Sequence, residues 1–190
     1  MTVLVVVGTV AALGGLARTS PDDLRAVAPG EEAVAAPFRV RLDRAEATYE
    51  VAGDVADEGL AFVVLEGGLT LDAEGSVDRV VVGEALSADL TSTYTTFGGP
   101  EQEGAPTSVV VADDGTELNG LGPGLTYDVL LVWVIDEAAV PSSMSVRLRE
   151  HTWRAGFIDK VEAWFDPSPV ASIRLEVAPL PDERPVEEPL

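Results

Sequence analysis

The sequence contains no cysteine, and among its 190 residues it has one histidine, one asparagine and one lysine. Without cysteine, the chain cannot form a disulfide, use a thiol nucleophile, hold a metal through thiolates or carry the acylated cysteine of bacterial lipoproteins. A single histidine also excludes centres that bind a metal through several imidazoles. No cofactor is expected, because no cofactor-binding or metal-binding motif is found.

Basic side chains are scarce as well. Lysine and arginine together number 12 against 33 acids, so the net charge is −21 and the pI is near 4.1. Nucleic acids and anionic lipid surfaces bind clustered basic residues, so neither is expected as a charge-driven partner. A hydrophobic fraction of 46% with 24% charged residues is typical of a globular chain, and the length suits one domain with a core of its own.

Residues 1–17 carry no charged side chain. As a helix they would span about 25 Å, at the short limit for a hydrocarbon core of about 30 Å. We expect an N-terminal apolar helix that acts as a transmembrane signal anchor, with the lipid bilayer as its partner. Two alternatives stay open: a signal peptide cleaved after Gly15-Leu16-Ala17, and a buried strand over residues 3–7 of a cytosolic protein.

The residues around this segment bear on those alternatives. A dinucleotide-binding strand would need glycine where Val10 and Leu13 stand, so that fingerprint is not met. No basic residue precedes the apolar run, while Arg18 and Arg25 follow it, which is opposite to the positive-inside rule. We therefore hypothesise that the true start lies upstream and supplies a basic leader.

Proline and acid content divides the remainder into three parts. Residues 18–37 are rich in proline, alanine and acid without a clear period, and they are predicted to form a linker. Residues 179–190 hold four prolines and five charges, which predicts a disordered acidic tail. Residues 38–178 lie between them and form the predicted folded domain.

Short β-rich or alternating segments recur through residues 38–178, and no helix of about ten residues is apparent there. The run over 127–135 is apolar on both faces and is expected at the centre of a sheet. The run from Leu60 is expected to continue to Leu71 through a bulge at Gly67-Gly68. The predicted strands are 38–43, 48–51, 60–71, 77–82, 107–112, 127–135, 145–149 and 171–177. Seven to nine such strands predict an all-β sandwich or barrel.

The turns between these strands carry a resemblance. The Asp114-Gly115 hairpin turn is followed by Leu121-Gly122-Pro123-Gly124 and then by the long apolar run that holds Trp133. This order resembles the telokin-like, immunoglobulin-like extracellular domains of secreted or membrane-anchored bacterial proteins. The resemblance covers residues 38–178 and departs from the family at 72–75, where the family usually has an asparagine-rich turn. It implies an immunoglobulin-like β-sandwich outside the cytoplasm, and it carries no catalytic residues.

Residues suited to catalysis are few. His151 is the only imidazole, and neither a Gly-x-Ser-x-Gly elbow nor a marked serine partner is present, so an enzyme is not expected. We expect His151 to be a surface or edge-strand residue beside Glu150. The acid clusters 54–58 and 113–114 do not match the spaced calcium-binding loop, and solvated turns are the expected structure for both.

The segment 153–167 concentrates aromatic residues between two predicted strands, so it is expected to be a long hairpin loop or a strand pair with a tip. Its aromatic residues either form an exposed binding patch for a protein partner or fold back over the open end of the sandwich. The candidate binding residues are Trp153, Phe157, Trp164 and Phe165. Trp133 is expected in the core.

Together these observations favour an interaction or structural module of the bacterial cell envelope. Its main domain would lie outside the cytoplasm on a single membrane anchor, or would be secreted if the leader is cleaved. A secreted hydrolase that uses His151 with carboxylates, and a soluble calcium-binding adhesion domain, are the alternatives.

Overall fold

The computed structural model describes residues 24–93, 103–156 and 160–184. Within these residues the chain is built almost wholly from strands, with one seven-residue helix, α2, and one short 3-10 turn, η2. The elements are β1 (Arg25–Val27), β2 (Glu32–Ala35), β3 (Phe38–Thr48), β4 (Glu50–Val51), β5 (Asp54–Val55), β6 (Leu60–Leu71), β7 (Val77–Asp78), α2 (Arg79–Ala85), β8 (Leu86–Ala88), β9 (Ser108–Val111), β10 (Gly120–Leu121), β11 (Thr126–Asp136), η2 (Glu137–Ala139), β12 (Ser143–Ala155) and β13 (Glu162–Ala178).

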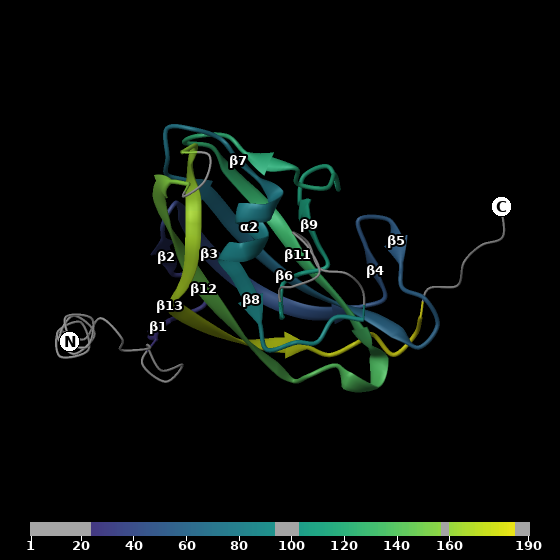
Figure 1. The fold of residues 1–190 in the computed structure, drawn as a ribbon. Helices are drawn as coiled ribbons and strands as arrows, with labels where there is room; N and C mark the ends of the chain where they lie inside the picture. Colours follow the sequence, from purple (N-terminus) through teal and green to yellow (C-terminus); the bar gives the residue numbers. More distant parts are fainter. Residues whose placement is uncertain (1–23, 94–102, 157–159, 185–190) are drawn as a thin grey trace, which may run out of the picture.

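One curled sheet forms both layers of a β-sandwich (Figure 1). Its strand order is β8-β12-β13-β3-β6-β11-β9, with β1 added to β13 and β2 added to β3. The layers are joined where the end of β13 pairs in parallel with β3, at Val177 opposite Ala45. The hairpin of β4 and β5 forms a separate two-stranded sheet (Figure 1). The predicted all-β sandwich is thus confirmed.

The core lies between the two layers because the strands alternate apolar and polar side chains. In β12 and β13 the buried residues include Val146, Leu148 and Ile173. Opposite them lie residues of β11 such as Leu131 and Trp133, both fully buried. The prediction that residues 127–135 lie centrally is confirmed, since β11 pairs with β6 on one side and β9 on the other.

The sandwich starts earlier than residue 38. Strands β1 and β2 lie within the range 18–37 that was predicted to be a linker. In β2 the small side chains of Ala33 and Ala35 are buried while Val34 is exposed. Alanine is a poor indicator of strand, which explains why the composition of this stretch suggested a linker.

The chain is also ordered beyond residue 178, within the range predicted as a disordered tail. Leu180 packs against the main core. Arg184 donates hydrogen bonds to backbone carbonyls of the segment between β5 and β6 and of Leu60, the first residue of β6. The prolines of this stretch prevent strand pairing, but they do not prevent a side chain from anchoring it.

Two local predictions differ from the structure. The predicted strand 77–82 is β7 followed by α2, because the Asp78 carboxylate accepts the backbone N–H groups of Val80 and Val81 and begins a helix. The predicted bulge in β6 lies instead in β3, between Leu42 and Arg44. Gly67 of β6 faces this bulge so closely that a Cβ atom there would collide with the Arg41 carbonyl.

Residues 1–17, the predicted apolar helix, lie outside the described residues. Within the parts of the chain that the structure describes, no helix is both long and apolar enough to span a bilayer.

Candidate functional site

A two-stranded ribbon carries the tryptophans that the sequence marked. The far halves of β12 and β13 pair from Thr152 opposite Phe165 to Ala155 opposite Glu162. The predicted strand pair is thus confirmed, in place of a long hairpin loop. Phe157 lies outside the described residues.

Trp153 and Trp164 are directly opposite each other in this ribbon. Their ring centroids are 5.3 Å apart and the ring planes meet at 62°, an edge-to-face arrangement that aromatic pairs prefer. Trp164 is partly buried against the main core, whereas Trp153 remains 50% exposed. The indole of Trp164 is therefore held by the core, and the indole of Trp153 is the one that solvent can reach.

A groove of about 480 Å³ lies between this tryptophan pair and the turn that follows β6. The paired ends of β12 and β13 meet this turn at one edge of the molecule (Figure 1). We call it the tryptophan groove. Its lining residues are Asp72, Ala73, Glu74, Gly75, Ser76, Trp153, Glu162 and Trp164. Its two walls are about 80 residues apart in the sequence, and the register of the strands brings them together.

The electrostatic character of the tryptophan groove is acidic. Asp72, Glu74 and Glu162 line it, and none of its described lining residues is basic. Among the described residues, Asp72 forms a long ion pair, with 3.9 Å between Arg39 Nε and Asp72 Oδ2. Glu74 and Glu162 make no ion pair with any residue that the structure describes, so the groove combines indole surface with largely uncompensated negative charge.

Phe165 does not face the tryptophan groove. It neighbours Trp164 in β13, and successive side chains of a strand point to opposite faces. The Arg154 guanidinium lies 4.5 Å from the centroid of its ring. Arg154 also donates two hydrogen bonds to Asp166, at 2.7 and 3.0 Å, which lower the pKa of the Asp166 carboxyl. Phe165 therefore belongs to a cluster in which Arg154 forms a cation–π contact with its ring and an ion pair with Asp166.

His151 is buried, contrary to the expectation of a surface histidine. Its side chain has no exposed surface and packs edge-on against Phe38, with 6.4 Å between ring centroids. Nε2 lies 3.4 Å from a Glu84 carboxylate oxygen, but neither ring nitrogen meets hydrogen-bond geometry with a described residue. Burial lowers the pKa of His151, Arg149 lowers it further, and Glu84 opposes both. A substrate could reach this imidazole only if the surrounding chain moved.

Of the acid clusters, 113–114 lies in a turn as predicted, whereas in 54–58 Asp54 belongs to strand β5 and only Glu58 lies in a turn. Asp114 accepts hydrogen bonds from the backbone N–H and the hydroxyl of Thr116, which lower the pKa of its carboxyl. Gly115 has φ of +72°, as the predicted Asp-Gly turn requires. In the described part of the chain no three acid or imidazole side chains are grouped closely enough to hold a metal ion.

Of the four candidate residues, the structure therefore brings Trp153 and Trp164 together and places Phe165 on the other face. The acidic wall at 72–76 was not identified from the sequence as part of a site. The acidic residues of this segment can be read from the sequence, but no spacing in the sequence connects them with a ribbon about 80 residues away.

Comparison with known proteins identifies the architecture. No family model matches the chain, and no curated protein matches it. A solved structure of an uncharacterized β-sandwich protein from Clostridium difficile 630 is similar, with a TM-score of 0.50 and 11% identity, over 84% of this chain and 97% of that one. A "putative lipoprotein" from Bacillus subtilis gives a TM-score of 0.41 and 9% identity, over 76% of this chain and 38% of its own length. At these identities the first likeness concerns the fold alone, and the second is too distant to support an argument.

Proposed function

We propose that this chain is a non-catalytic interaction module of the cell envelope, which binds a cationic side chain of a protein partner in the tryptophan groove. The observation that carries the proposal is the half-exposed indole of Trp153 beside the acids Asp72, Glu74 and Glu162. Neither feature is explained by the packing of the sandwich.

A cation fits this groove for two physical reasons. An ammonium or guanidinium over an indole face gains about 0.5–1 kcal/mol at an exposed site, and more where water is excluded. The carboxylates of Glu74 and Glu162, which pair with no described cation, attract the same group, and the net charge of −21 favours the approach of a basic partner. An acidic partner would meet repulsion from both sources.

The envelope location forms part of the same proposal. It is supported by the uncharged residues 1–17, which have the composition of a signal anchor. We place the domain outside the cytoplasm, on this anchor or secreted after its cleavage. We classify the sandwich as immunoglobulin-like because its mostly antiparallel strands enclose a core that contains Trp133. Recovery in membrane pellets after a high-salt wash supports the anchor, while recovery in the cytosolic fraction would reject it.

Tryptophan fluorescence of the full chain tests the binding proposal. A decapeptide of alternating arginine and glycine should quench and shift the emission, whereas the matching glutamate peptide should not. Trp133 is fully buried and supplies a constant background. The signal should be lost in Trp153→Ala and weakened in Glu162→Gln.

Asp113→Asn is the matched control, because it removes one acid from a turn that does not line the tryptophan groove. An arginine peptide that leaves the emission unchanged would reject the proposal. So would an equal loss of affinity in Glu162→Gln and Asp113→Asn, since that result would mean that only overall charge matters.

A further inference from the structure

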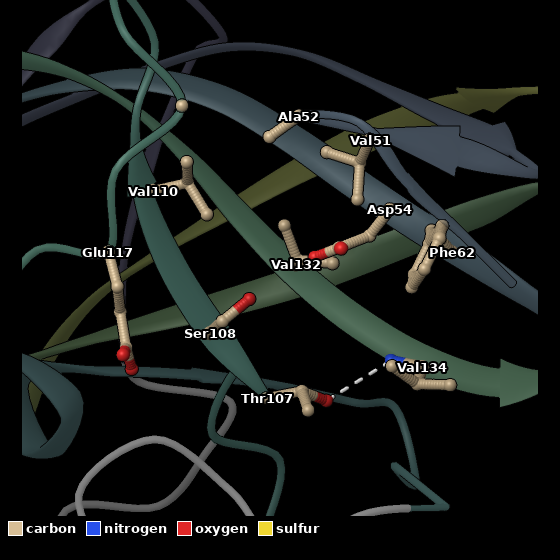
Figure 2. A pocket seen from close by; sticks show the side chains of 11 residues that line it. Val51, Ala52, Asp54, Phe62, Thr107, Ser108, Val110, Glu117, Val132 and Val134 are labelled. Atoms are coloured by element: carbon tan, nitrogen blue, oxygen red, sulfur yellow. Dashed lines mark hydrogen bonds between the residues drawn. The ribbon is translucent and has the colours of Figure 1, made fainter.

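A second hollow lies on the opposite side of β11, away from the core. It encloses about 370 Å³ between the β4–β5 hairpin and the outer face of β6, β11 and β9 (Figure 2). We call it the hairpin crevice. Val51 and Ala52 of the hairpin lie over it, and the side chains of Phe62, Val110 and Val132 form its floor.

The floor belongs to an apolar cluster that is separate from the main core. The outer face of a two-layered sandwich is ordinarily polar, because it meets water. Here β6 and β11 are apolar on both faces, so their outer face needs a cover of its own. The hairpin covers it but leaves a hollow within the size range of small-molecule sites.

Two polar groups lie over this floor, and neither has a partner among the residues that the structure describes. Figure 2 shows the Asp54 carboxylate and the Ser108 hydroxyl directed over Val132. Neither side chain makes an ion pair or hydrogen bond with a described residue. The Thr107 hydroxyl, by contrast, accepts the backbone N–H of Val134 at 3.1 Å.

Charge defines the ligand. Asp54 and Glu117 are the ionisable residues among those that line the crevice, and both are acidic. Glu117 Oε1 is already 3.7 Å from Arg79 Nη1, so within the described parts of the chain Asp54 is the crevice carboxylate that has no cation. An anionic amphiphile such as a fatty acid would be repelled, while an ammonium could bond to Asp54 and Ser108 together.

The floor of the crevice offers little exposed apolar surface, since Phe62, Val110 and Val134 are each only 8% exposed. A slender, unbranched chain fits such a space better than a ring or a protein segment. We infer that the hairpin crevice binds a small primary alkylammonium, with its alkyl chain on the valine floor and its ammonium between Asp54 and Ser108. This site shares no residue with the tryptophan groove and does not depend on its function.

Calorimetric titration of the full chain tests the inference, with hexylammonium as the probe. Hexylammonium should bind, while hexanoate, which has the opposite charge, and methylammonium, which lacks the chain, should not. Loss of a hydrogen bond to a charged group predicts a decrease in affinity of about tenfold or more in Asp54→Asn, and a smaller decrease in Ser108→Ala.

Asp113→Asn removes one acid outside the crevice and should bind hexylammonium as the wild type does. Trp153→Ala should also bind normally, which separates this site from the tryptophan groove. The inference is overturned if hexylammonium does not bind, if hexanoate binds equally well, or if Asp54→Asn and Asp113→Asn are indistinguishable. Asp54 is exposed, so a folded variant is expected, and its melting temperature verifies this.

Discussion

Arg184 fastens the end of the described chain to the sandwich, and its removal should lower stability measurably. Its guanidinium donates three hydrogen bonds of 2.7–2.9 Å to the backbone carbonyls of Ala56, Asp57 and Leu60. It also lies 4.4 Å from the centroid of the Tyr49 ring and 3.2 Å from a Glu137 carboxylate oxygen. With its side chain 29% exposed, these contacts are only partly open to solvent.

The expected loss in Arg184→Ala follows from these contacts. A hydrogen bond to a charged group contributes about 1.5–3 kcal/mol when well shielded, and an exposed cation–π contact about 0.5–1 kcal/mol. Because the contacts share one side chain and are partly hydrated, we expect a total of about 2–3 kcal/mol rather than their sum. For a chain of this length that corresponds to a decrease in melting temperature of about 5–10 °C.

Thermal unfolding followed by circular dichroism measures this loss. Arg174→Ala is the matched control, since Arg174 also bonds through its guanidinium, but only to the Ser143 hydroxyl on the exposed surface. That variant should lose less than about 1 kcal/mol. Equal melting temperatures for the two variants would refute the assignment of Arg184 as an anchor.

Two further variants test the interior. Because the pKa of His151 is lowered below its usual value near 6.5 in the folded protein, the unfolded chain takes up the proton first. The free energy of unfolding should therefore have its full value above pH 6.5, and it should decrease below pH 6.5 by at most about 1.4 kcal/mol per pH unit because of His151. In urea titrations between pH 7 and 5, His151→Phe should lack this part of the decrease. Gly104→Ala should lose at least about 2 kcal/mol in urea unfolding, because Gly104 has φ of +78° and a Cβ there would collide with the Ala88 carbonyl. Gly53→Ala is the control, because Gly53 has φ of +87° but open space around it, and this variant should lose less stability. Equal losses in the two variants would contradict the prediction, since they would mean that the collision at Gly104 costs nothing.

The strands of the sandwich could be predicted because the burial of a strand face leaves a pattern of apolar residues in the sequence. Apolarity on both faces of 127–135 correctly placed β11 inside the sheet. Because both faces of β11 are apolar, the face that points away from the core must also be apolar. This outer face forms the floor of the hairpin crevice. The helix α2 was missed because one capping aspartate, Asp78, outweighs the strand preference of three consecutive valines.

Long-range geometry accounts for what the sequence did not predict. Arg149 and His151 are two residues apart, so a regular strand would place both on the same face. Register shifts at Leu148/Arg149 and Glu150/Thr152 disturb the alternation, and His151 turns into the core. Arg184 bonds to backbone carbonyls, which leave no pattern in a sequence.

Heteronuclear NMR of the three indole N–H groups, during titration with the alternating arginine–glycine peptide, tests the central claim most directly. Trp153 and Trp164 line the tryptophan groove, while Trp133 is buried with its indole N–H bonded to the Gly104 carbonyl. The account predicts that the signals of Trp153 and Trp164 move and that the signal of Trp133 stays in place. Three unmoved signals, or equal movement of all three, would contradict it.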